Sequence, residues 1–162
     1  DWVYETAEST RYHALNIGKL DNMGVSLNSK MQLHEDAKSA FPFQPMTVRL
    51  GYSYIHQSHK TDQPIYRSLY ALEYLRHKLT VQLDQHIWNR LSLSWSVRWQ
   101  QRMNGFHPYW KIDGKLQCKA ENLTLYLKGD NLTAHRYYDI GAVKQPGLWI
   151  MAGGVFQLRL KR

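Results

Sequence analysis

A strict alternation of apolar and polar residues between Arg90 and Gln101 constrains the fold of this 162-residue chain more than any other feature. Every second residue is apolar, namely Leu91, Leu93, Trp95, Val97 and Trp99. Successive side chains of a β-strand point to opposite sides, so the stretch predicts a strand with one apolar and one polar face. About eleven such residues can cross a bilayer as a tilted strand, and the same pattern also suits a half-buried strand of a soluble sheet.

The same alternation recurs along the chain, and no stretch has helical periodicity of useful length. It predicts a partial strand at 1–4 and seven further strands, at 24–33, 46–54, 68–84, 90–101, 110–119, 123–130 and 150–160. The connections that follow Asp84 and Ala120 are short, whereas those after His56, Gln101 and Asn131 are long and polar. Outer-membrane barrels have this arrangement of short turns on one side and longer loops on the other.

Composition is compatible with a membrane barrel without requiring one. The chain is 43% hydrophobic and 21% charged, and no apolar run approaches the roughly 18 residues of a membrane helix. A chain of this kind can cross a bilayer only as part of a closed barrel. The mean hydropathy of -0.56 does not oppose this interpretation, because half of every barrel strand is polar.

Other functional classes find little support. The net charge of +8 is spread singly along the strands, so we expect no nucleic-acid partner. The single Cys118 excludes an internal disulfide, and no nucleophile motif, paired carboxylates or glycine-rich phosphate loop indicates an enzyme or a cofactor. The chain starts at Asp1 within a strand-like phrase, without an initiator methionine or signal peptide, which indicates a processed or truncated piece of a longer protein.

Two pairs of residues are candidate ligand contacts. His56 and His59 form a His-x-x-His in a predicted external loop, but two ligands without a third are more typical of a solvated loop, and we predict no metal site. Tyr137 and Tyr138 lie in the last predicted loop, outside the alternating region, and are candidates for contact with a ligand.

Basic residues occupy polar positions of many predicted strands. They can attract anionic substrates or pair with an acidic domain, although barrel interiors are generally polar and we favour that simpler interpretation. We predict that they face a barrel lumen: Lys30, Arg49, Lys78, Arg98, Lys111, Lys115, Lys119 and Lys128.

Several phrases resemble late barrel strands of TonB-dependent outer-membrane receptors, in the style of Bacteroidetes. They are NIGKLDNMGVSL (16–27), LGYSYIHQ (50–57), YLRHKLTVQL (74–83) and, most specifically, GDNLTAHRYYDIGAVKQPGLWIMAGGVFQL (129–158). The last resembles the family pattern at Asn131, Leu132, Tyr137 or Tyr138, Pro146, Gly147 and Gly153 or Gly154, and departs from it at Thr133 and Leu148.

The resemblance runs over nearly the whole chain and implies that residues 1–162 are the C-terminal portion of a barrel of about 22 strands. It implies transport of cobalamin, an iron-siderophore or haem across the bacterial outer membrane. The implied partners are outer-membrane lipid, a plug domain that this chain lacks, TonB acting through that plug, and a surface-exposed lipoprotein.

The fold class expected is therefore all-β, with antiparallel up-and-down transmembrane barrel strands. Two alternatives remain open on the residues alone. One is a self-contained eight-stranded outer-membrane barrel, and the other is a soluble β-sandwich or lipocalin-like binding module.

Overall fold

The computed structural model describes residues 1–16, 18–33, 45–60, 65–68, 74–88, 90–103, 105–139 and 143–158. All regular elements in this part of the chain are β-strands, and none is a helix. They form two antiparallel sheets, one of seven strands and one of three. The predicted all-β class is confirmed.

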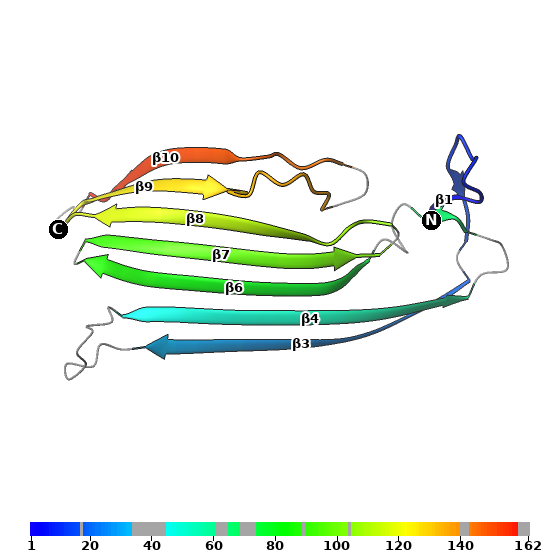
Figure 1. The fold of residues 1–162 in the computed structure, drawn as a ribbon, viewed down its shortest axis with the longest axis horizontal. Helices are drawn as coiled ribbons and strands as arrows, with labels where there is room; N and C mark the ends of the chain where they lie inside the picture. The colour runs from blue at the N-terminus through cyan, green and yellow to red at the C-terminus, as the bar shows by residue number, and fades with distance from the viewer. Residues whose placement is uncertain are drawn as a thin grey trace.

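The large sheet is an up-and-down meander in the order β10-β9-β8-β7-β6-β4-β3. Figure 1 shows its strands side by side in this order. The strands are β3 (Lys19–Leu33), β4 (Met46–Lys60), β6 (Leu75–Trp88), β7 (Leu91–Arg102), β8 (Tyr109–Lys119), β9 (Leu123–Asp130) and β10 (Trp149–Phe156). These correspond to the seven strands predicted from alternation.

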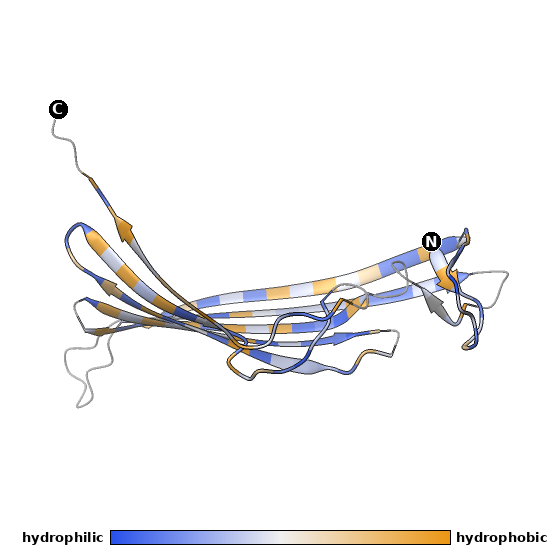
Figure 2. Cartoon of the chain, turned by 90° about the horizontal axis from the view of Figure 1, so that it is seen from above, coloured by the Kyte–Doolittle hydropathy of each residue, from blue (hydrophilic) through white to orange (hydrophobic). Residues whose placement is uncertain are grey.

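The strand register aligns the apolar positions of neighbouring strands, so that the sheet has one continuous apolar face and one continuous polar face. Val81 lies opposite both Leu50 and Val97, and Val97 lies opposite Ile112, so apolar positions meet apolar positions across four strands. Leu116 continues this face onto Leu127. Figure 2 shows the result from above: a single layer of strands in which hydrophobic and hydrophilic residues alternate along each ribbon.

Several predicted boundaries are wrong. The strand predicted at 68–84 does not begin at Ser68. Its counterpart β6 begins at Leu75, and β5 (Arg67–Ser68) belongs to the small sheet. Strand β4 extends to Lys60, since its polar end pairs with β3 through Lys19. The two prolines between Ala37 and Pro45 predict a turn, but residues 34–44 lie outside the described part of the chain.

The small sheet has the order β2-β1-β5, with β1 at Trp2–Tyr4 and β2 at His13–Ala14. The predicted partial first strand therefore forms, but in this separate sheet. The N-terminal ammonium of Asp1 donates to the carbonyl of Leu15 at 2.6 Å, and the ring of Tyr4 stacks on Tyr12 at 3.9 Å. These contacts tie both ends of segment 1–15 together.

The large sheet is open. Strands β3 and β10 each have a neighbour on one side only, so the described residues form no closed barrel, either of eight strands or of 22. No second layer covers the apolar face, and among the described apolar side chains only Val3, Tyr109 and Tyr137 are buried. A sandwich core is therefore not formed within this part of the chain.

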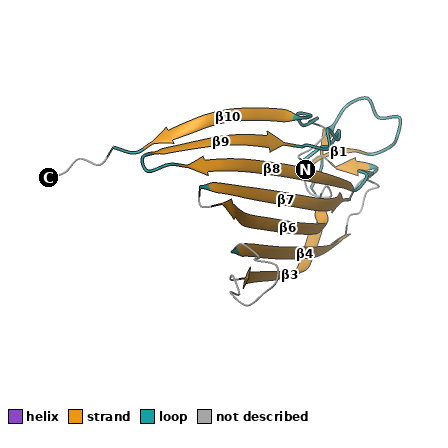
Figure 3. Ribbon diagram, turned by 60° about the vertical axis from the view of Figure 1, so that its left-hand side comes forward, coloured by secondary structure: helices purple, strands orange, loops and turns teal. Residues whose placement is uncertain are grey.

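The connections differ between the two ends of the sheet. The links from Trp88 to Leu91 and from Lys119 to Leu123 are short, but the link from Leu33 to Met46 at the same end spans residues 34–45. The links from Lys60 to Leu75, Arg102 to Tyr109 and Asp130 to Trp149 share the opposite end. Figure 3 shows the small sheet at this same end. We call it the loop end of the sheet.

The pairing of β9 with β10 depends on a glycine beneath an aromatic ring. Gly153 lies opposite Tyr126, and a Cβ atom on Gly153 would lie 2.5 Å from the hydroxyl oxygen of Tyr126. We predict that Gly153→Val displaces this ring and destabilises the sheet by roughly 1 to 3 kcal/mol. Denaturant unfolding measures the loss, with Gly147→Ala as control because a Cβ there meets nothing within 4 Å.

The double variant Gly153→Val with Tyr126→Ala removes the clash, so its two effects should be clearly non-additive. Additive losses would contradict the assigned pairing.

Candidate functional site

The polar face of the sheet gathers the basic residues that alternation predicted to share one side. The strand register brings six of them together as three cross-strand pairs: Lys30 with Arg49, Arg98 with Lys111, and Lys115 with Lys128. Lys78 and Lys119 lie in the same alternating positions, opposite Gln100 and Thr124. That this face lines a lumen stays a prediction.

Acidic side chains balance several of these cations. Lys111 lies 3.2 Å from Asp113, Lys128 lies 3.0 Å from Asp130, and Arg49 is paired with Asp84. The ammonium of Lys115 lies 5.2 Å from the centroid of the Tyr126 ring. Partly exposed pairs of this kind contribute at most about 1 kcal/mol each. The middle of the face is thus mixed in charge, without a group of cations that converges on one point.

The loop end is more elaborate, because the connection between β9 and β10 folds back onto the polar face. One carboxylate, Asp139, holds it there. Its Oδ1 atom accepts hydrogen bonds from Gln100 at 2.9 Å and from the hydroxyl of Tyr109 at 2.5 Å, and its Oδ2 atom lies 3.6 Å from the guanidinium of Arg98. Charge-assisted hydrogen bonds are among the stronger polar contacts in proteins.

Asn131 anchors the start of the same connection. Its side chain is 1% exposed and donates to the carbonyls of His135 and Pro146 at 2.9 and 3.2 Å, while its oxygen accepts from the hydroxyl of Thr133 at 2.9 Å. Its backbone has a positive φ of 53°, a conformation that asparagine tolerates better than most residues. Asn131 therefore holds both the start of the connection, through His135, and its end, through Pro146.

The two candidate tyrosines have different positions. Tyr137 is 6% exposed and packs with its ring centroid 4.7 Å from that of Tyr109, so it supports the connection from within. Tyr138 is 37% exposed, and its carbonyl accepts a hydrogen bond from Arg102 at 3.0 Å. Only Tyr138 presents much of its ring to the surroundings.

The two candidate histidines lie on opposite faces of one strand. His56 and His59 lie within strand β4 and not in a loop, opposite Met23 and Leu20 of β3. Residues three apart on a strand point to opposite faces, so both imidazoles cannot bind one ion. No group of three or more potential metal ligands occurs among the described residues.

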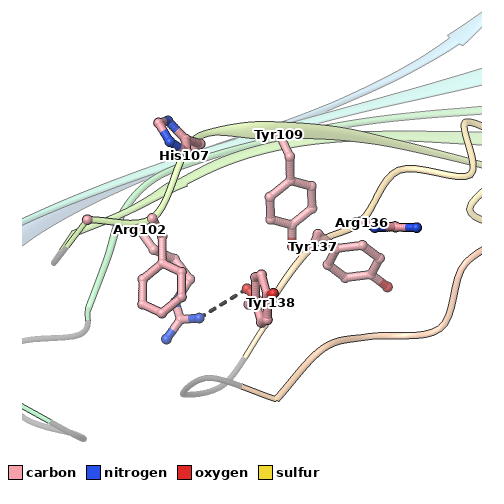
Figure 4. Close-up of a pocket in the computed structure, with 8 residues that line it drawn as sticks. Arg102, His107, Tyr109, Arg136, Tyr137 and Tyr138 are labelled. Atoms are coloured by element: carbon pink, nitrogen blue, oxygen red, sulfur yellow. Dashed lines mark hydrogen bonds between the residues drawn. The ribbon is translucent and has the colours of Figure 1, made fainter.

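A pocket of about 330 Å³ opens beside the folded connection. Figure 4 shows Arg102 bonded to Tyr138 in its lining, with His107 and Arg136 at opposite sides of the group of rings. The lining comes from the end of β7, the start of β8 and the two connections at the loop end: Arg102, Gly105, Phe106, His107, Tyr109, Arg136, Tyr137 and Tyr138. Sequence reasoning identified only the two tyrosines, because alternation carries no signal for residues that meet between loops.

Comparison of the chain with protein-family models, with characterised proteins and with solved structures finds no match. The resemblance to TonB-dependent receptors therefore remains an expectation from the sequence phrases. Within the described residues, no helix is long and apolar enough to cross a bilayer.

Asn131 offers a direct test of how the connection is held. We predict that Asn131→Ala opens it, since the change removes the buried side-chain hydrogen bonds and places alanine at a positive φ, at a cost of roughly 2 to 4 kcal/mol. Hydrogen exchange should then become faster in residues 131–139 and remain unchanged in β6.

Asn131→Gly is the matched variant, because it also loses the side chain but accepts the backbone conformation. It should open the connection less than alanine does. Equal protection in both variants and the unmodified chain would show that Asn131 is not the anchor.

Proposed function

We propose that this chain forms part of the wall and external loops of a large outer-membrane β-barrel of the TonB-dependent receptor type. One observation carries the proposal: seven consecutive antiparallel strands form a single layer with one continuous apolar face, one polar face rich in basic residues, and two open edges. A barrel wall needs all of these features, because lipid covers the outer face, water or a plug covers the inner face, and further strands cover the edges.

Exposure of the apolar face supports lipid as its partner. Large apolar side chains are exposed on several of the strands. The exposed fraction is 66% for Leu27, 52% for Leu125 and 63% for Phe156. Soluble monomers rarely expose continuous apolar surface on this scale. Hydrocarbon would cover it without a second protein layer.

The longer strands are long enough to cross a membrane. At about 3.3 Å per residue, the 15 residues of β3 and β4 extend about 50 Å, and the 8 residues of β9 and β10 about 26 Å. The apolar band of an outer-membrane barrel is about 25 Å tall, and its strands are tilted by about 40°. At that tilt a strand rises about 2.5 Å per residue, so β9 and β10 cover about 20 Å and fall short of the band, whereas β3 and β4 cover about 38 Å and extend beyond it, toward the loop end.

A row of aromatic rings crosses the apolar face near the loop end. The ring of His77 lies 4.9 Å from Tyr54 and 6.1 Å from Trp99, and Trp99 lies 6.1 Å from Trp110. Trp88, 71% exposed, lies at the other end, opposite Leu91. The path along β7 from Leu91 to Trp99 is about 26 Å, or about 20 Å across the membrane at a tilt of about 40°. Amphipathic rings near both ends of the apolar face are typical of strands that reach the two interfaces of a bilayer.

In this proposal the chain transports and does not catalyse. By resemblance, the imported nutrient would be cobalamin, an iron-siderophore or haem, and the loop end would face the outside of a bacterial outer membrane. A plug domain outside these 162 residues would fill the lumen and be moved by TonB, and a surface lipoprotein would assist capture. The basic polar face would contact the plug or the passing solute.

Paired labels on neighbouring residues test the assignment of the two faces. In a Cys118→Ser background, we place spin labels at Leu79, Val81 and Val97 on the apolar face and at Thr80, Gln82 and Ser96 on the polar face, in the full barrel protein that contains this chain, inserted into lipid vesicles. We predict that collision with oxygen, which concentrates in lipid, is higher for the first set, and collision with a water-soluble nickel chelate is higher for the second. The period of two follows from the strand geometry.

Equal nickel accessibility on both faces would overturn the proposal. The same alternation in buffer without lipid would also overturn it, because the apolar face would then be covered by protein.

A further inference from the structure

We infer that the pocket at the loop end binds a small planar anion, of the class of aromatic carboxylates. The inference goes beyond the proposed function, because a barrel wall needs no pocket. The residues that carry it are the aromatic side chains of Phe106, Tyr109 and Tyr138 and the cationic side chains of Arg102 and Arg136.

The pocket has the size and composition of a small-molecule site. Its volume of about 330 Å³ lies at the lower end of the range for such sites, which are commonly about 300 to 1,000 Å³ and lined by aromatic residues with a few polar groups. Four of its lining residues carry aromatic rings, and these come from β8 and from both connections. Flat apolar walls of this kind favour a planar ring over a branched aliphatic group.

The pocket is also pre-formed. Arg102 is 7% exposed, lies 4.3 Å from the centroid of Phe106 and donates to the carbonyl of Tyr138 at 3.0 Å. The amide of Gln145 donates to the carbonyl of Tyr137 at 2.9 Å, which fixes the outer wall. A site held in this way loses little conformational entropy when a ligand binds.

Charge selects an anion. The lining contains two arginines and a histidine and no carboxylate. Asp139, which follows Tyr138 of the lining, is already engaged by Arg98, Gln100 and Tyr109. Arg136 and His107 are exposed and make no hydrogen bond or ion pair within the described part of the chain. A carboxylate matches the two parallel N–H donors of a guanidinium.

Binding of 4-fluorobenzoate to the chain in lipid vesicles, followed by fluorine NMR line broadening with protein-free vesicles as blank, tests the inference. The neutral 4-fluorobenzamide has the same ring and nearly the same shape. We expect the carboxylate to bind about tenfold more tightly, the value of one charge-assisted hydrogen bond. Cyclohexanecarboxylate, which has the charge without the aromatic ring, should compete about threefold less effectively than benzoate.

Two variants locate the site. Arg136→Gln should weaken binding of the carboxylate about fivefold and leave the amide unchanged, and Phe106→Leu should weaken both about threefold. Lys119→Gln is the matched control, because it removes one charge from β8 at the end away from the loops and should have no effect.

Equal binding of carboxylate and amide to the unmodified chain would overturn the inference without any variant. An equal loss in Arg136→Gln and Lys119→Gln would also overturn it, since diffuse positive charge would then explain the binding. Neither result depends on which face of the sheet meets lipid, so the pocket and the barrel wall can fail separately.

Discussion

The need to cover one continuous apolar face governs this structure. Antiparallel register aligns the apolar positions of seven strands, so that Leu50, Val81, Val97 and Ile112 form one row among several. Covering such a face stabilises a protein by about 25 cal/mol for each square ångström of apolar area. The described chain covers it with nothing of its own. Lipid, a second layer of protein or aggregation must therefore take that role, and we propose lipid because of the length of the longer strands and the aromatic rings near both ends of the apolar face.

The loop end contrasts with the rest of the sheet, because its stability comes from polar contacts. Asn131 and Asp139 hold the connection between β9 and β10 through hydrogen bonds that are mostly shielded from solvent. This anchoring places Tyr137 and Tyr138 beside Arg102 and creates a pocket where the sheet alone would have a flat polar surface. A rigid sheet that carries an anchored loop is a common way to position binding residues.

The sequence predicted the fold correctly wherever the local pattern of a strand determines the strand's position and the direction of its side chains. Period-two alternation identified all seven strands of the large sheet and the shared face of Lys111 and Lys115, because side-chain direction follows directly from backbone geometry. The sequence prediction failed where pairing with another strand determines whether a residue lies in a strand, and in which sheet. The polar stretch that contains His59 has no strand signal of its own and becomes a strand by pairing with β3. Ser68 joined a different sheet for the same reason, and the pocket combines segments that are distant in sequence.

The most direct test of the central claim is sedimentation of the full barrel protein that contains this chain, with and without lipid vesicles, together with circular dichroism of each fraction. The account predicts that β-structure forms when that protein is bound to vesicles, and that the protein in plain buffer is aggregated or unfolded. A monodisperse, β-rich monomer or small oligomer in buffer alone would contradict it, because protein would then cover the apolar face that we assign to lipid.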